Sequence, residues 1–272
     1  WYAALEEFCR PIMLRSRLIP VLLLRGKSFV KTVNFKRFSY IGDPCNTVRI
    51  FNELEVDEIS ILDIMATRLN QEPNYDLISD IASEAFMPLS YGGGIKTINH
   101  AKKIFDLGIE KIILNSEAIN RPELISEISG IYGSQAVTVS IDVKQSFFSQ
   151  KQKIYTKCGT QSTNLELVEW ALKCQSMGAG EIMLNAIDRD GTWSGYDISL
   201  FRNLSLQLSI PLIGIGGAKN IDSARDLIIN TQCSAAGVGS MVVFQKEGHG
   251  VLINYPEPSV INAKLHNKFD ED

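Results

Sequence analysis

An aspartate stands where a predicted strand meets its loop. Residues 137–144 read VTVSIDVK, an apolar run that closes on Asp142 and then enters a polar loop. A carboxyl group in that place can exchange a proton with a substrate, or it can accept hydrogen bonds from loop N–H groups. The residue types alone leave both roles open. Three further aspartates occupy similar strand ends: Asp63, Asp188 and Asp190.

Two glycine-rich turns have the composition of phosphate-binding loops. YGGGIKT (91–97) and IGIGGAKN (213–220) each follow a predicted strand, and a short polar stretch follows the next strand in each case, NSEAI (115–119) and GSMV (239–242). Free backbone N–H groups in such turns bind anions. The alternative is that the glycines only permit tight turns. Because the two turns recur at matched positions, we predict two phosphate sites, suited to a ligand with a phosphate at each end.

A charged residue directly precedes the apolar run of four predicted strands: Arg17, Glu58, Lys111 and Glu181. Two are positive and two are negative, so around one mouth of a barrel they could form a neutral ring of ion pairs. From the residue types alone we favour the simpler interpretation of four separate surface charges, each of which stabilises the fold little.

Positioning these residues requires a scaffold that gathers strand ends. The apolar runs that predict strands are 18–24, 58–63, 88–91, 111–115, 137–142, 181–186, 211–215 and 235–239. Amphipathic stretches such as 97–108, 164–178 and 220–230 lie between them. Alternation of strands and helices indicates parallel strands with crossover helices, and eight such units predict a closed (β/α)8 barrel, the TIM-barrel fold.

An internal repeat supports the barrel. Residues 87–108 resemble residues 210–230 at an offset of 123 positions. The repeat predicts two similar half-barrels and pairs the opening strands, RLIPVLLL and VTVSIDVK. Leu23 then stands where the second half carries Asp142.

Composition limits the class of protein. The chain has 272 residues, 45% hydrophobic and 21% charged, with a net charge of −4. This balance gives no overall attraction to nucleic acid or to membrane surfaces. No apolar run approaches the ~18 residues that span a bilayer, and no signal peptide is evident, so we predict a cytoplasmic protein.

The thiols and imidazoles do not suggest a metal site or a disulfide framework. The odd number of cysteines and the lack of CxxC spacing indicate free thiols: Cys9, Cys45, Cys158, Cys174 and Cys233. The histidines do not cluster in the sequence: His100, His249 and His266. We expect no metal and no cofactor.

We predict one domain over residues 13–272. Residues 1–12 look like an extra segment, because Met13 stands just before the first strand and is the natural start that we expect. The tail from about residue 254 is weakly patterned, and we expect it to be partly loose.

From about Arg17 to Phe244 the chain resembles the cyclase subunit of imidazole glycerol phosphate synthase, the HisF family. The matching stretches are NFKRFSYIGDP, DEISILDI, YGGGI, KIILNSEAI, GSQAVTVSIDVK, GAGEI, IDRDGTWSGYD and GGAKN. The resemblance implies a two-fold repeated barrel with a glutaminase subunit, of HisH type, docked on its bottom face. It also implies that ammonia passes along the barrel axis to a bisphosphate substrate at the top, where two aspartates act as acid and base.

The resemblance assigns roles to residues of this chain. The residues implied to bind phosphate or substrate are Lys31, Gly94, Asn115, Ser116, Asp190, Gly191, Gly216, Gly217, Gly239 and Ser240. The family's ammonia gate matches the four charged residues at the strand starts, which reverses the interpretation made from their types alone. Of the two catalytic aspartates, one matches Asp142 and the other aligns with Leu23.

The chain departs from the cyclase at two places. The loop after the first strand is RGKSFVK, with Arg25 and Lys27 where the family is acidic, and residues 244–256 do not resemble the family's C-terminal helix. A leucine cannot exchange a proton, and losing one member of an acid–base pair commonly costs orders of magnitude in rate. Both departures resemble a paralogous group that accompanies surface-polysaccharide genes, with a glutaminase and an N-acetyl sugar amidotransferase.

The resulting hypothesis is a HisF-type subunit that conducts ammonia from a glutaminase for the amidation of a surface-polysaccharide sugar. Two alternatives remain. One is a working cyclase of histidine biosynthesis, with Asp142 aided by another acid such as Asp63 or Asp190. The other is a non-catalytic scaffold that activates the glutaminase.

Overall fold

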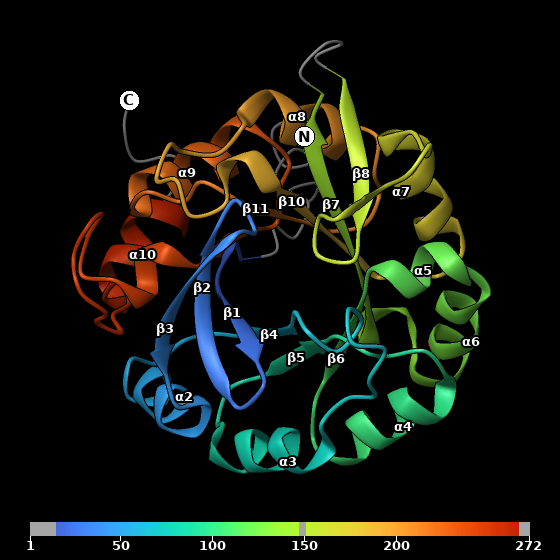
Figure 1. Cartoon of the computed structure of the whole chain (residues 1–272). Helices are drawn as coiled ribbons and strands as arrows, with labels where there is room; N and C mark the ends of the chain where they lie inside the picture. Colours follow the sequence, from blue (N-terminus) through green and yellow to red (C-terminus); the bar gives the residue numbers. More distant parts are fainter. Residues whose placement is uncertain (1–14, 147–150, 267–272) are drawn as a thin grey trace, which may run out of the picture.

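The computed structural model describes residues 15–146 and 151–266, and the predicted extra segment 1–12 lies outside these ranges. Eight parallel strands close into a barrel, with helices around its outside (Figure 1). In order around the barrel they are β1 (Arg17–Arg25), β4 (Ile59–Asp63), β5 (Leu89–Gly92), β6 (Lys111–Leu114), β7 (Val137–Gln145), β10 (Glu181–Ala186), β11 (Leu212–Ile215) and β12 (Ala235–Val238). Strand β12 pairs with β1, which closes the ring. The predicted (β/α)8 fold is confirmed.

Helices follow the strands and bury their apolar faces against the outside of the barrel. They are α2 (Pro44–Glu53), α3 (Tyr75–Glu84), α4 (Ile98–Asp106), α5 (Ser116–Asn120), α6 (Glu123–Tyr132), α7 (Leu167–Ser176), α8 (Ile198–Ser205), α9 (Ile221–Asn230), α10 (Ser240–Val243) and α11 (Pro258–Ile261). Capping side chains define where several helices begin: the Asp43 carboxylate accepts from the Asn46 N–H at the start of α2, and Asn220 forms a capping box with Ser223 at the start of α9. No helix within the described ranges is long and apolar enough to cross a membrane.

The two halves of the barrel repeat the same turn. Gly93 follows β5 with φ +122°, and Gly216 follows β11, 123 residues later, with φ +105°. A Cβ atom at Gly93 would lie 2.5 Å from the Asp63 carbonyl oxygen, and one at Gly216 would lie 2.6 Å from the Ala186 carbonyl oxygen. Both turns therefore require glycine, for its backbone conformation and for the close approach of the preceding strand end.

Side chains fill the interior of the barrel. Seven buried hydrophobic residues from five strands form one cluster inside it: Ile19, Val21, Ile113, Met183, Ile213, Ile215 and Ala235. Two hydroxyl groups also pair in the interior, since Ser60 Oγ lies 2.8 Å from Ser90 Oγ. The barrel axis is thus a mainly apolar column between the two ends of the strands.

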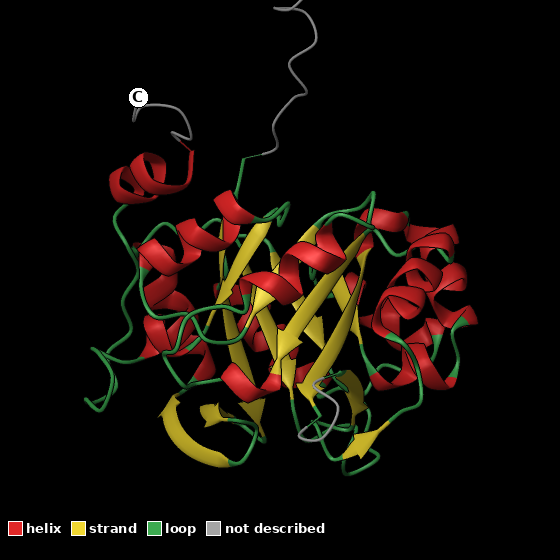
Figure 2. Ribbon diagram, turned by 90° about the horizontal axis from the view of Figure 1, so that it is seen from above, coloured by secondary structure: helices red, strands yellow, loops and turns green. Residues whose placement is uncertain are grey.

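Two short hairpins, which the sequence pattern does not predict, extend from the carboxyl end of the barrel. One is β2 (Ser28–Val33) with β3 (Arg37–Gly42), after β1, and the other is β8 (Gln152–Thr156) with β9 (Gln161–Ser162), after β7. Figure 2 shows both at the same end of the molecule. They raise walls around the end of the barrel at which active sites of this fold are built.

The chain after residue 254 is more regular than its weak pattern suggests. Helix α11 continues into a π-helical turn, Asn262–His266, which packs against α9. Ile261 and Leu265, four residues apart on one helical face, are both buried. The Tyr255 hydroxyl donates a hydrogen bond of 2.7 Å to the Leu18 carbonyl oxygen. These contacts join the described part of this segment to the barrel, and the expectation of a partly loose tail stays a prediction.

Candidate functional site

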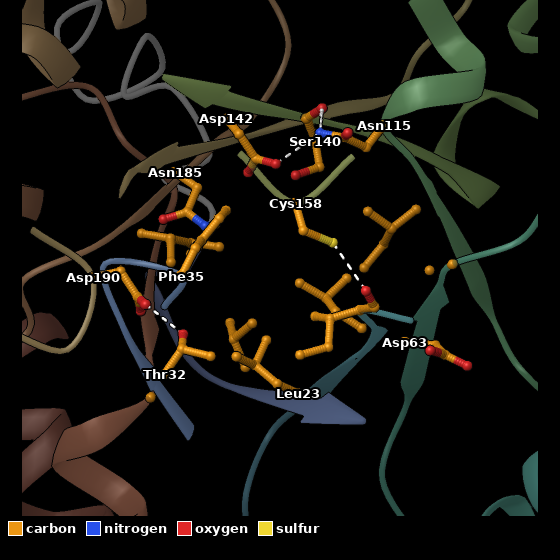
Figure 3. A pocket seen from close by; sticks show the side chains of 18 of the residues that line it. Leu23, Thr32, Phe35, Asp63, Asn115, Ser140, Asp142, Cys158, Asn185 and Asp190 are labelled. Atoms are coloured by element: carbon orange, nitrogen blue, oxygen red, sulfur yellow. Dashed lines mark hydrogen bonds between the residues drawn. The ribbon is translucent and has the colours of Figure 1, made fainter. Parts of the chain in front are cut away.

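A pocket of about 140 Å³ opens at the carboxyl ends of the barrel strands, under the two hairpins. Apolar side chains form most of its floor, and polar groups reach it from several strands (Figure 3). Asp142 and all ten residues implied to bind phosphate or substrate line it: Lys31, Gly94, Asn115, Ser116, Asp190, Gly191, Gly216, Gly217, Gly239 and Ser240. The fold therefore brings together in one cavity residues that lie more than 200 positions apart.

Asp142 projects into this pocket from β7 as a buried carboxyl group. Asn115 Nδ2 donates to Asp142 Oδ2 at 3.1 Å and also to the Ser140 carbonyl oxygen at 3.0 Å. Burial raises the pKa of Asp142 to about 7, although hydrogen bonds from Asn115 and Asn185 oppose the rise; the charge of Asp190 adds to it. A carboxyl group that titrates near neutral pH is suited to accept or to donate a proton.

Leu23 lies across the pocket from Asp142 (Figure 3). It pairs with Leu62 of β4, whereas Asp142 pairs with Asn185 of β10, and these two partners are 123 positions apart, as the repeat requires. Leu23 and Asp142 are therefore equivalent positions of the two half-barrels. The first half supplies a buried, apolar side chain where the second supplies an acid.

The carboxylates of Asp63 and Asp188 accept hydrogen bonds from backbone N–H groups of the protein itself. Asp63 Oδ1 accepts from the Met65 N–H at 2.8 Å and from the Ala66 N–H at 3.0 Å, which fixes the loop after β4. Burial raises the pKa of Asp63, and these two hydrogen bonds oppose the rise. Asp188 accepts from the Gln145 N–H at 2.7 Å and is exposed.

Lys31 and Asp190 form a buried ion pair with each other. Lys31 Nζ lies 2.6 Å from Asp190 Oδ1, and Thr32 Oγ1 donates to Asp190 Oδ2 at 2.6 Å. Lys31 Nζ also donates to the Thr32 carbonyl oxygen at 2.9 Å. Both carboxylate oxygens of Asp190 are thus engaged, while one N–H of the lysine is left for a ligand.

In the first predicted phosphate site, the Ser116 hydroxyl already forms hydrogen bonds with neighbouring residues. Ser116 Oγ donates to Asn115 Oδ1 at 3.2 Å and accepts from the Lys157 N–H at 3.0 Å. In the second site, a Cβ atom at Gly239 would lie 2.8 Å from Lys31 Cε, so glycine leaves room for the lysine side chain. Both glycine-rich turns and Lys31 line the same pocket, and phosphate binding by them stays a prediction.

The four charged residues at the strand starts meet at the opposite, amino end of the barrel. Arg17 pairs with Glu58 at 2.8 Å and with Glu181, and Lys111 pairs with the same two carboxylates at 2.9 Å and 3.6 Å. Burial lowers the pKa of Arg17, but the charges of Glu181 and Glu58 outweigh that effect and raise it. The four form one closed ring, hereafter the charged ring, and are not separate surface charges.

Sequence reasoning missed several residues of the pocket. Thr32, Cys158 and Asn185 all line it. Asn185 lies opposite Asp142 in the strand pairing, and its Oδ1 atom is buried without a hydrogen-bond partner among the described residues. Cys158 Sγ donates to the Ile64 carbonyl oxygen at 3.1 Å, and burial raises its pKa to about 12. The asparagine was detectable as a polar residue in an apolar strand, but the cysteine sits on an unpredicted hairpin.

Comparisons with known proteins agree with this architecture. Residues 17–247 match the family described as "Histidine biosynthesis protein". A Pseudomonas aeruginosa protein, provisionally named imidazole glycerol phosphate synthase subunit hisF2, is 47% identical over 251 residues, which cover 92% of this chain and 100% of that protein. A Vibrio vulnificus protein, provisionally named subunit hisF3 of the same synthase, is 46% identical over 247 residues, covering 91% and 95%. The Lactococcus lactis imidazole glycerol phosphate synthase subunit HisF is 38% identical over 229 residues, covering 84% and 88%. The chain belongs to the HisF family of imidazole glycerol phosphate synthase subunits.

Proposed function

We propose that this chain is the barrel subunit of a glutamine-dependent amidotransferase complex. A glutaminase subunit of HisH type binds the amino end of the barrel and releases ammonia there. The ammonia passes the charged ring and follows the barrel axis to the pocket. A phosphorylated small molecule occupies the phosphate-binding turns of the pocket.

The observation that carries this proposal is the alignment of three features along one axis. The charged ring closes the amino end, apolar side chains fill the middle, and the pocket with Asp142 opens at the carboxyl end. A neutral molecule as small as ammonia loses little by entering an apolar column, whereas an ion pays a large desolvation cost.

Leu23 determines the destination of the ammonia in this proposal. Leu23 stands where the second half-barrel carries Asp142, so the pocket lacks one of the two aspartates that the cyclase reaction uses, and the chain passes ammonia onward to an acceptor enzyme. Amidation of a surface-polysaccharide sugar by an N-acetyl sugar amidotransferase fits such a chain, which keeps the charged ring and lacks the second acid.

The second candidate is a working cyclase of histidine biosynthesis. Asp142 favours it, because burial raises its pKa to about 7, in the range of an effective general acid or base. This candidate requires another acid to replace the missing aspartate, and the two other aspartates that line the pocket are already engaged. Asp190 is bound by Lys31 and Thr32. Asp63 accepts hydrogen bonds from two loop N–H groups.

Cyclase turnover separates these two candidates. The purified chain is given the bisphosphate substrate of the cyclase with a high concentration of ammonium salt, which replaces the glutaminase. We expect turnover close to zero for the unmodified chain and a gain for Leu23→Asp. Turnover of ~1 per second or more in the unmodified chain would overturn the sugar-amidation proposal.

The third hypothesis is a scaffold that only activates the glutaminase, and a substitution of Lys111 tests it. Lys111→Ala opens the charged ring, so under our proposal it disturbs the transfer of ammonia from glutamine to the acceptor while glutamine hydrolysis continues. If transfer were unchanged by this substitution, the scaffold reading would be favoured.

A further inference from the structure

Phe86 is the most exposed large hydrophobic residue among those described, with 91% of its surface accessible. It lies in the loop between α3 and β5, at the amino end of the barrel. An exposed phenylalanine of this degree costs solubility and gains nothing for the fold of the free chain. Its presence on the same end as the charged ring therefore needs an explanation from outside the chain.

The backbone around Phe86 is held in place by two side chains of α2. Asn52 accepts from the Phe86 N–H at 3.0 Å through Oδ1 and donates to the Glu84 carbonyl oxygen through Nδ2. Arg49 binds the Glu84 carboxylate with two N–H groups, at 2.8 Å and 3.1 Å. The loop is thus fixed on both sides of a side chain that contacts little else. A side chain presented on a fixed backbone loses less entropy when a partner covers it.

Phe86 is connected to the rim of the charged ring. Two residues after it, the Pro88 carbonyl oxygen accepts from the Ile59 N–H at 3.0 Å, and Ile59 follows Glu58 of the ring. Ser90 of the next strand pairs with Lys111, also of the ring. A partner that covers the mouth of the barrel at the ring therefore lies within reach of this loop.

The surface near Phe86 is acidic. Residues 53–58 read ELEVDE, and four exposed acids lie at this end of the barrel: Glu53, Glu55, Asp57 and Glu110. None of the four forms an ion pair with another described residue. A second copy of this chain would place acid against acid across a two-fold interface, so self-association is disfavoured and a basic partner surface is favoured.

We propose that Phe86 is the anchor for the glutaminase subunit, which receives it in an apolar socket with a basic rim. This inference rests on the proposed function, which places a glutaminase at this end of the barrel. Aromatic residues near the centre of an interface commonly carry a large share of the binding free energy. The acids around Phe86 contribute chiefly to the rate of association and to its dependence on salt.

The test measures the affinity of the full chain for its cognate glutaminase subunit by isothermal titration calorimetry. We expect Phe86→Ala and Phe86→Asp to raise Kd by at least about 30-fold. Leu69→Asp is the matched control, because Leu69 is 55% exposed in the loop after β4, at the opposite end of the barrel. We expect it to leave Kd unchanged. All three variants should keep the thermal midpoint of the unmodified chain, since both side chains are exposed.

The outcomes separate this inference from the proposed function. If the unmodified chain does not bind the glutaminase, both are overturned. If it binds and Phe86→Asp binds equally well, only the anchor is overturned. Sedimentation velocity tests whether a second copy of this chain covers Phe86 instead. If the unmodified chain is a dimer and Phe86→Asp is a monomer, the surface belongs to a second copy and the glutaminase is overturned as its partner.

Discussion

Leu23 and Asp142 occupy equivalent positions of the two half-barrels and face each other across one pocket. The strand partner of Leu23 is Leu62, and the strand partner of Asp142 is Asn185, so the difference extends to the neighbouring strand. At this one pair of equivalent positions the first half-barrel is apolar and the second is polar.

Placing a second acid at Leu23 should couple the two positions electrostatically. In Leu23→Asp the new carboxyl group shares the pocket with Asp142, and two like charges resist simultaneous ionisation, so the pKa of at least one rises above 7. We expect the free energy of unfolding of this variant to fall more between pH 6 and pH 8 than that of the unmodified chain. Denaturant unfolding at the two pH values measures this. Leu23→Asn has the same shape without the charge and should show no additional fall.

Asp142 should make the protein less stable as the pH rises. Its pKa lies at about 7 in the folded chain and at 3.8 for the free side chain, so between these values the folded state binds more protons than the unfolded state. The free energy of unfolding therefore declines from about pH 4 to pH 7, by at most on the order of 4 kcal/mol. We expect Asp142→Asn to be more stable than the unmodified chain at pH 8 and to lose that advantage at pH 4. An equal difference at both pH values would contradict this assignment.

Opening the charged ring should destabilise the fold. Lys111→Met leaves Glu58 and Glu181, which are almost fully buried, with Arg17 as their single cation in the ring. We expect a loss of about 2–4 kcal/mol in the free energy of unfolding, because a buried carboxylate is left incompletely neutralised. Lys102→Met is the control, since its ion pair with Asp106 is exposed and of the i,i+4 type, and its thermal midpoint should stay unchanged.

The turn after β11 should reject any side chain. Gly216→Ala requires an unfavourable positive φ and places a Cβ atom 2.6 Å from the Ala186 carbonyl oxygen. Gly108→Ala has a similar φ of +91° and no atom within 4 Å of the new Cβ. We expect the first to cost about 2–3 kcal/mol more than the second, a difference that isolates the clash from the backbone strain. Thermal unfolding of the two variants measures it.

The strands and their order were accessible from the sequence because each strand is a continuous apolar run. Strand β1 is buried along both faces, from Leu18 to Leu24, as expected for a parallel strand covered by helices. The hairpin that carries Cys158 could not be predicted from the sequence, because β8 and β9 are short and mostly polar. Their pairing depends on the end of β7, a tertiary context that no local pattern reports.

The charged ring could not be predicted from residue types alone. The residue types at Arg17 and Glu58 are compatible with isolated surface charges, and only closure of the barrel brings them into contact with charges on β6 and β10. The resemblance to a family identified the ring, whereas local physical reasoning did not. Likewise, the ion pair between Lys31 and Asp190 joins strand β2 to the loop after β10, 159 positions apart, and no spacing rule predicts it.

Each member of the charged ring contacts both residues of opposite sign. No side chain can leave its place without breaking two contacts at once, and the loss of one member leaves its two former partners sharing the remaining ion of opposite sign. The four charges are therefore energetically coupled, so the effects of substituting any two of them will not add.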